Sequence, residues 1–226
     1  MARNGLKVEA FDIGKRGSSS DVVFDALRDA IIRGQLAEGE ILRQDTIAQM
    51  FNVSRIPVRE ALQRLEAQGL VTSTRYKGVV VTPMSIAEIE EVFEFRALLE
   101  PRVIAFAVPQ MTAASLDQAR AYCEAFAAET QPTRWGDLNR QFHSALYADA
   151  RRPYFMSVID KTNDRIDRYV RAQLELTHGM ERARRDHQAI LDACAAGDAQ
   201  AAADLTREHI VNAGRTLVAF LKAAGR

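Results

Sequence analysis

The chain lacks the cysteine motifs and the long apolar runs by which disulfide-rich, secreted and membrane proteins are recognised. It has only two cysteines, Cys123 and Cys194, and no C-x-x-C motif. Both cysteines lie in alanine-rich helical patterns, which is typical of small buried thiols in a reducing compartment. No run approaches the ~18 apolar residues that a membrane span requires, and the first residues lack the apolar segment of a secretory signal. The sequence therefore predicts a cytoplasmic protein that does not enter a membrane.

An excess of charge is absent as well, because 30 Lys and Arg balance 30 Asp and Glu. The chain as a whole has no net positive charge that would attract nucleic acid. Any positively charged surface that binds nucleic acid must therefore be confined to one region. One such region lies between residues 43 and 78, where six basic residues stand against three acidic ones, a net charge of +3. Phosphate attraction supplies most nonspecific affinity for nucleic acid, and a neutral chain therefore favours specific over indiscriminate binding.

Strand-forming sequence is confined to a short part of the 226 residues. β-Branched runs at Val71–Thr74 and Val79–Thr82 flank a turn at residues 76–78, which predicts a hairpin, and residues 40–42 can add a short first strand. From Ile86 onward the pattern is helical only. The helices predicted there span residues 86–108, 113–129, 134–150, 154–177, 180–196 and 199–224.

The segment VSRIPVREALQRLEAQGLV, residues 53–71, is typical of an amphipathic helix. Ser54 is the expected N-cap, with its hydroxyl accepting a hydrogen bond from a first-turn amide. Pro57 falls in the first turn, where its missing N–H costs nothing. Aliphatic side chains recur at i, i+3, i+4 and i+7 and form the expected buried stripe: Val58, Ala61, Leu62 and Leu65.

The opposite face of this helix carries Arg55, Arg59 and Gln63 at spacings of i, i+4 and i+8. A guanidinium group matches the two acceptors on a guanine edge, and a glutamine can serve adenine, so the face has the chemistry of a major-groove reader. The alternative is an ordinary solvated helix face, since arginines are common on exposed surfaces.

The flanking segments favour the first interpretation. Residues 43–51 predict a short helix, and only Asn52 and Val53 separate it from Ser54, which is helix-turn-helix spacing. Another helix is predicted at residues 21–33. With the hairpin after Gly69, these elements predict a winged helix-turn-helix.

Residues 53–71 resemble the signature of the GntR family of bacterial transcription regulators, and the resemblance extends from about Val22 to Pro83. It implies that four residues touch operator DNA: Ser54, Arg55, Arg59 and the wing glycine Gly78. Three more are candidates for DNA contacts: Arg43, Gln63 and Lys77. Asp45 stands where some members place a basic DNA contact, so we expect the helix at residues 43–51 to contribute less to base reading.

A second group of candidate residues lies in the helical region. Asn139 and His143 are i, i+4 neighbours and project from one helix face. His187 and His209 lie in the last two predicted helices, on faces that also carry Leu or Ile and should point inward. Three imidazoles and one oxygen that converged inside a helical bundle would form a divalent transition-metal site. Taken without any family, ordinary core or surface histidines are the commoner explanation, because these residues come from three separated segments.

Residues 86–224 resemble the FCD domain that follows the DNA-binding domain in the FadR subfamily, in its short six-helix form. The resemblance rests on FRALLEP, on NRQFH, and on the spacing from His187 to His209. It implies a metal, often zinc or nickel, held by the equivalents of those four residues, with small carboxylates bound beside it. Asn139 stands where aspartate is commonest, and the loss of an anionic ligand should weaken the site and can alter its choice of metal.

Arg96 matches a position that often faces the cavity in FCD domains. Its guanidinium could bind an effector carboxylate through two hydrogen bonds. A salt bridge with Glu94 or Glu100 is the alternative.

These observations predict a mainly α protein with a flexible N-terminal arm at residues 1–20. A winged helix-turn-helix DNA-binding domain follows at residues 21–83, and an all-α, FCD-like effector-binding and dimerisation domain at residues 86–226. We expect a homodimeric, ligand-responsive transcription regulator that binds a pseudo-palindromic operator and a small organic acid. One alternative is a constitutive architectural DNA-binding protein. Another is a helical metallohydrolase, but the sequence has no H-E-x-x-H motif to supply a general base, so we do not expect an enzyme.

Overall fold

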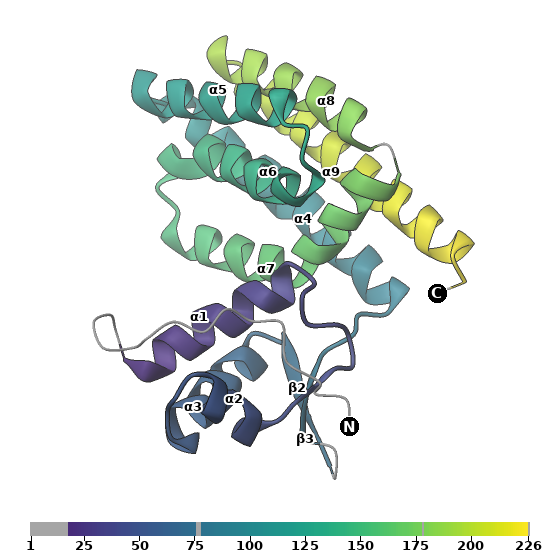
Figure 1. Cartoon of the computed structure of the whole chain (residues 1–226). Helices are drawn as coiled ribbons and strands as arrows, with labels where there is room; N and C mark the ends of the chain where they lie inside the picture. The colour runs from purple at the N-terminus through teal and green to yellow at the C-terminus, as the bar shows by residue number, and fades with distance from the viewer. Residues whose placement is uncertain (1–17, 76–77, 178, 226) are drawn as a thin grey trace. The chain divides into compact units, whose positions relative to one another are not determined.

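The computed structural model describes residues 18–75, 78–177 and 179–225, and the chain divides into two compact units between Met84 and Ser85 (Figure 1). Most of the predicted N-terminal arm, residues 1–17, lies outside the described residues. The arm was predicted to end at Ser20, but the first helix already begins at Ser19 because the Ser18 hydroxyl caps it by accepting a hydrogen bond from the Asp21 amide at 3.2 Å.

The N-terminal unit has three α-helices among its described residues: α1 (Ser19–Ile32), α2 (Gln44–Met50) and α3 (Arg55–Ala67). The turn between α2 and α3 is tight because Asn52 adopts a left-handed φ of 52°, a conformation that asparagine tolerates better than most residues. The predicted helix-turn-helix is therefore present, with helix bounds close to those expected from the sequence.

Three short strands form a sheet in the described part of this unit: β1 (Ile41–Leu42), β2 (Val71–Thr74) and β3 (Gly78–Val81). Their order is β1-β3-β2 with antiparallel pairing, so Val80 lies opposite both Ile41 and Thr72. Gly78 opens β3 with a φ of 89°, which only glycine adopts at low cost. The apolar faces of α1, α2, α3 and the sheet enclose one core that includes Val23, Leu27, Ile47, Leu62 and Val81.

Six α-helices make up the described part of the C-terminal unit. They are α4 (Ile86–Ala107), α5 (Ala113–Ala128), α6 (Pro132–Tyr147), α7 (Pro153–Leu176), α8 (Gly179–Ala195) and α9 (Ala199–Ala223). A capping box opens α4: the Glu88 amide donates to the Ser85 hydroxyl at 3.2 Å, and the Ser85 amide donates to the Glu88 carboxylate at 2.8 Å. The mainly helical fold with a small N-terminal sheet is thus as predicted.

The largest difference from the predicted helix bounds is in α6, which was expected at residues 134–150. It begins at Pro132 because proline is suited to the first helical turn. It ends at Tyr147 because residues 148–150 tighten into a 3-10 turn and Arg151 takes a left-handed φ of 52°.

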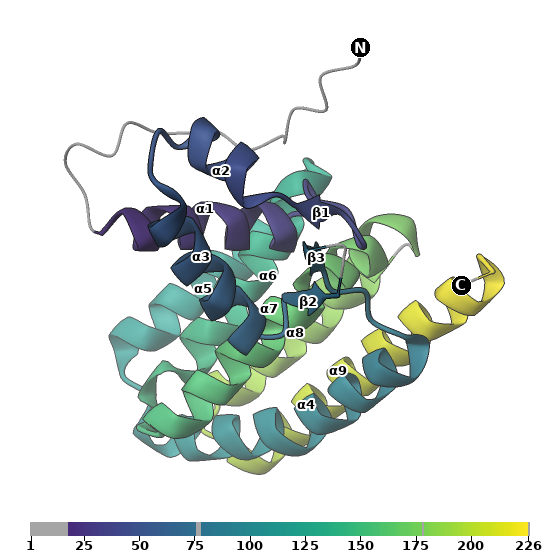
Figure 2. The ribbon, with the colours of Figure 1, turned by 90° about the horizontal axis from the view of Figure 1, so that it is seen from below.

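The bundle places α4 and α9 side by side along much of their length (Figure 2). Helix α5 packs against α6 and α8, and α7 contacts α4, α6, α8 and α9. Cys123 and Cys194 are buried free thiols, as expected, and burial raises the pKa of Cys194 to about 12. Among the described residues, no helix is both long and apolar enough to cross a membrane.

Candidate functional site

Helix α3 is positioned by its apolar side. The four residues of the predicted stripe are all buried in the core of the N-terminal unit: Val58, Ala61, Leu62 and Leu65. Ser54 is the N-cap of α3. The prediction that its hydroxyl accepts a capping hydrogen bond is wrong, because the described structure has no such bond. Its exposed hydroxyl is therefore not occupied in capping the helix.

The other side of α3 is exposed and carries Arg55, Arg59 and Gln63. The Arg55 guanidinium forms an ion pair with the Asp45 carboxylate of α2, and both side chains are largely exposed, at 73% and 60%. Such exposed pairs contribute little to stability. Arg64 points elsewhere, because it pairs with Asp21 of α1 at 2.7 Å. The exposed face of α3 thus holds two arginines, Arg55 and Arg59, and Arg55 is paired with the Asp45 carboxylate.

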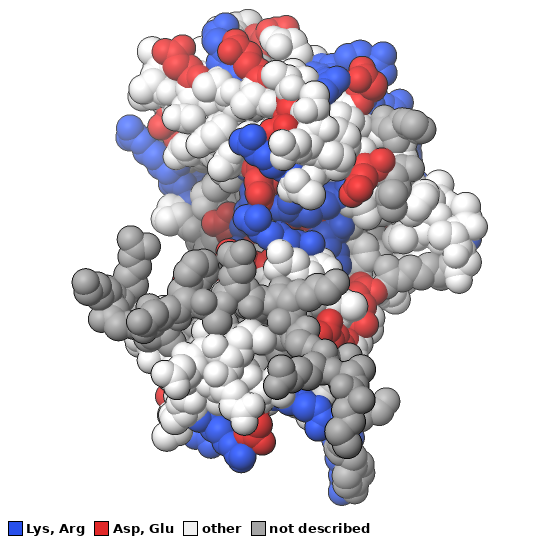
Figure 3. Space-filling model, in the orientation of Figure 1, with Lys and Arg blue, Asp and Glu red and all other residues white. Residues whose placement is uncertain are grey.

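The remaining candidates for DNA contact lie at two other points of the N-terminal unit. Arg43 is exposed at the N-cap of α2, and Gly78 is exposed at the start of β3. Lys77 lies outside the described residues. Basic and acidic atoms stand side by side at the end of this unit where Figure 1 labels α2 and α3, as Figure 3 shows.

The three histidines singled out from the sequence converge in the C-terminal unit. His143 comes from α6, His187 from α8 and His209 from α9, and one ligand nitrogen from each lies within 4.8 Å of the others. The residues are only 4%, 0% and 9% exposed. This group could hold a metal ion, because imidazole nitrogens at such separations can be drawn onto one centre.

The hydrogen bonds around the histidines leave nitrogens available to a metal. The Asp186 carboxylate lies 3.0 Å from Nδ1 of His209, and the Tyr147 hydroxyl lies 3.4 Å from Nδ1 of His143. Among the described residues, Nε2 of His143 and both ring nitrogens of His187 are buried without a hydrogen-bond partner. Buried polar atoms are rarely left unpaired, and a metal would satisfy them, so the residues fit such an ion.

Burial also sets the protonation of two of these rings. Desolvation lowers the pKa of His143 and of His187 well below the usual value, and the neighbouring His209 lowers both further. Both imidazoles are therefore neutral near pH 7, which is the form that binds a metal.

We expect the metal-free protein to lose stability on mild acidification. Unfolded histidines titrate near pH 6.5, whereas the folded pKa values of His143 and His187 lie well below that. Between these pKa values the unfolded state binds more protons. The free energy of unfolding should therefore fall as the pH drops below about 6.5, by about 1.4 kcal/mol per pH unit for each histidine.

Urea denaturation in the presence of a chelator, at about pH 7.5 and about pH 5.5, measures this effect. The His187→Gln variant should show a shallower dependence on pH because one of the two titrating groups is gone. A pH slope equal to that of the unsubstituted protein would contradict the assignment.

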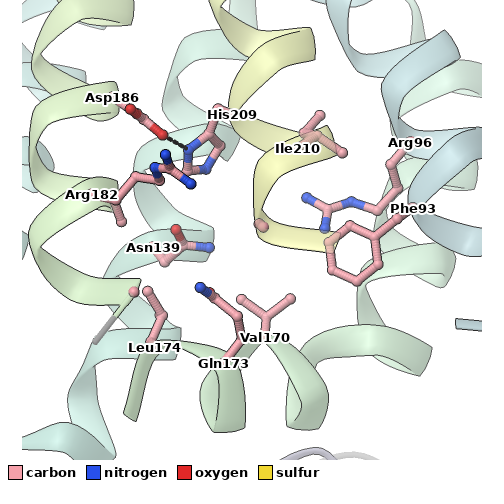
Figure 4. Close-up of a pocket in the computed structure, with 13 residues that line it drawn as sticks. Phe93, Arg96, Asn139, Val170, Gln173, Leu174, Arg182, Asp186, His209 and Ile210 are labelled. Atoms are coloured by element: carbon pink, nitrogen blue, oxygen red, sulfur yellow. Dashed lines mark hydrogen bonds and ion pairs between the residues drawn. The ribbon is translucent and has the colours of Figure 1, made fainter. Parts of the chain in front are cut away.

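Asn139 and Arg96 line a cavity beside the histidines. The space open to the centre of a water molecule here is about 20 Å³, which is room for about one water, and it is bounded by residues of α4, α6, α7, α8 and α9. Asn139, Gln173 and Arg96 point into it from α6, α7 and α4, and His209 stands at its edge (Figure 4). A group that entered this space would meet two guanidinium groups, two amides, the Asp186 carboxylate and the edge of the histidine group.

Arg96 forms the salt bridge considered as the alternative and also lines the cavity. It is buried, and its Nε donates to Oε1 of Glu100 at 2.6 Å, which is the salt bridge named as the alternative. That bond uses one of the donors of the guanidinium, and Arg96 also lines the cavity. The salt bridge and a contact with a ligand are therefore compatible.

The sequence interpretation missed Asp186, Tyr147 and Arg182. Tyr147 follows His143 by one helical turn, a spacing that could have revealed it. Asp186 precedes His187 in the chain but pairs with His209 of another helix, so no local pattern could have shown its role. Arg182 reaches the cavity from α8, near Asp186 and His209 (Figure 4).

Comparison with known proteins covers both units. The FCD domain family matches residues 91–212, and the family of bacterial regulatory proteins called gntR matches residues 19–81. The chain is 27% identical over 198 residues to the HTH-type transcriptional repressor GlaR of Escherichia coli, covering 82% of this chain and 89% of that protein. A GntR family transcriptional regulator from Pseudomonas syringae is 31% identical with a TM-score of 0.56, covering 91% and 88%. A GntR regulator from Rhodococcus sp. RHA1 shares the fold, with a TM-score of 0.79 at 24% identity, covering 90% and 99%.

Proposed function

This chain belongs to the gntR family of bacterial regulatory proteins and carries an FCD domain, and from that premise we propose that it is a ligand-responsive regulator of transcription in the cytoplasm. Its relatives are transcriptional regulators and not enzymes. The proposal assigns DNA binding to residues 21–83. Effector binding and dimerisation fall to residues 86–226.

The DNA partner is a pseudo-palindromic operator bound by a homodimer. Two copies of α3 would enter successive major grooves, and the exposed side chains of Arg55, Arg59 and Gln63 support this because they offer donors suited to purine edges. Ser54 and Arg43 would lie against the phosphates. The wing at Gly78 and Lys77 would lie beside the neighbouring backbone.

The histidine group is proposed to hold a divalent transition metal, zinc or nickel. The observation that carries this proposal is the buried, unpartnered state of Nε2 of His143 and of both His187 nitrogens among the described residues. His209 supplies the third nitrogen and Asn139 the amide oxygen. When bound, the ion would supply a Lewis-acidic centre that leaves room for an exogenous carboxylate.

The effector is proposed to be a small organic acid that binds in the cavity beside this site after the side chains lining the cavity move apart to admit it. Arg96 would bind its carboxylate, because a buried guanidinium on the cavity wall is a strong partner for an anion. Helix α4 carries Arg96, and only Met84 and Ser85 separate it from Pro83, the last residue of the proposed DNA-binding domain. An effector that favours one position of α4 over another would therefore change the distance between the two recognition helices of the dimer.

A thermal-shift screen of small carboxylates, with and without zinc, tests this function together with operator titrations. We expect selected carboxylates to raise the melting temperature more in the presence of zinc, and to change operator affinity. Equal operator affinity of the metal-free, zinc-bound and carboxylate-bound protein would eliminate the proposal. Such a result, with no carboxylate hits, would favour a constitutive architectural DNA-binding protein.

A further inference from the structure

A chain of buried polar groups runs from the cavity arginine to the histidine group. Nε of Arg96 donates to Oε1 of Glu100 at 2.6 Å, and the Tyr147 hydroxyl donates to Oε2 of the same carboxylate at 2.8 Å. The Tyr147 oxygen also lies 3.4 Å from Nδ1 of His143. Glu100 is 0% exposed and Tyr147 is 1% exposed. The carboxylate therefore links two helices, α4 and α6, inside the bundle.

The direction of these hydrogen bonds follows from their chemistry. The Tyr147 hydroxyl donates to a carboxylate oxygen of Glu100, so its proton points toward that oxygen. Burial and the adjacent carboxylate raise the pKa of Tyr147 well above its usual range, which keeps that proton in place. The remaining lone pair of the tyrosine oxygen can accept from an N–H at Nδ1 of His143. Nε2 of His143 then carries a lone pair, and this is the buried nitrogen without a partner among the described residues.

The two ends of the network cannot move independently. Each oxygen of Glu100 is engaged by one donor, and a buried carboxylate that loses a partner becomes strongly unfavourable. Turning Arg96 away would leave Oε1 unpaired. Turning Tyr147 away would leave Oε2 unpaired and release Nδ1 of His143.

We propose that Glu100 and Tyr147 are positioning residues that fix the His143 imidazole for metal binding and tie it to the Arg96 guanidinium. A displacement of Arg96 then alters the position of His143, and a displacement of His143 alters that of Arg96. The network thus connects the effector subsite physically to the metal site. This inference rests on the proposed metal-binding function. It deepens that function by assigning roles to two residues that do not touch the metal.

Cobalt titration of the metal-free, full-length protein tests the inference, because Co²⁺ reports its ligand arrangement through visible absorption. The Tyr147→Phe variant should bind Co²⁺ about 10- to 100-fold more weakly, the usual cost of losing a partner that orients a metal ligand. Its absorption spectrum should change as the imidazole loses its anchor. Glu100→Gln is the second variant, with the same expected directions, in case the phenylalanine variant folds poorly.

Leu146→Val is the matched control. Leu146 is fully buried on α6 next to Tyr147, so shortening it weakens packing without touching the network. Its Co²⁺ affinity and spectrum should equal those of the unsubstituted protein. Unchanged affinity and spectrum in Tyr147→Phe would overturn the inference and leave the metal site standing, whereas no Co²⁺ binding by the unsubstituted protein would remove both.

A double-mutant cycle tests the connection to Arg96 with the metal alone as the probe. Arg96→Lys should weaken Co²⁺ binding several-fold in the unsubstituted background, because lysine cannot reproduce the Nε hydrogen bond to Glu100. The same substitution should have little effect in the Tyr147→Phe background, where the path is already broken. Additive effects of the two substitutions would overturn the connection.

Discussion

The His187→Ala variant is expected to lose stoichiometric metal and to melt at a lower temperature than the unsubstituted protein. His187 is fully buried, with ring centroids 5.0 Å from those of both His143 and His209. Its loss removes one of three imidazole ligands and leaves a cavity, which costs about 2–5 kcal/mol for a large buried side chain. A metal present at about 1,000 times its dissociation constant contributes about 4 kcal/mol more, and this is lost as well.

A chelator separates the two contributions. It should lower the melting temperature of the unsubstituted protein but leave that of His187→Ala unchanged. Phe126→Leu is a suitable control, because the Phe126 ring packs 4.7 Å from the His187 ring and its truncation weakens the core without removing a ligand. That variant should keep its response to the chelator. If elemental analysis of the carefully purified protein finds no stoichiometric metal, the assignment fails.

Arg59→Ala is expected to lose about 1–3 kcal/mol of specific operator binding, with its fold unchanged. Arg59 is exposed on α3, one turn after Arg55, where its removal disturbs no core contact. Arg55→Ala should lie toward the lower end of the same range. Its guanidinium is already paired with Asp45, and that pair must open or be shared when DNA binds.

Fluorescence anisotropy at one fixed salt concentration measures this loss, with an operator selected from a random duplex library and an unrelated duplex for comparison. Arg207→Ala, an exposed arginine on α9, serves as the control and should bind as the unsubstituted protein does. Unchanged operator affinity in Arg59→Ala would show that the contact is misassigned.

The sequence by itself determined the helices and the order of the elements. The buried stripe of α3, the turn between α2 and α3 and the capping box at Ser85 all depend on residues within a few positions of one another. Such features can be predicted from the sequence because helical periodicity and capping patterns depend on residues that are close together in the chain. The candidate DNA-contact residues on α3 belong to this class, since they lie opposite the buried stripe and are exposed, as that pattern predicts.

Only the tertiary structure decided which distant side chains meet. The convergence of His143, His187 and His209 depends on how α6, α8 and α9 pack, and the spacing of these residues along the chain leaves that open. The contact of Asp186 with His209, the pair of Arg55 with Asp45 and the link through Glu100 and Tyr147 arise between different helices. The cap expected at Ser54 is an exception among the local features, because Ser54 is the N-cap of α3 but its side chain makes no capping hydrogen bond. A residue pattern gives the position of a cap, whereas the hydrogen bond also depends on the side-chain conformation.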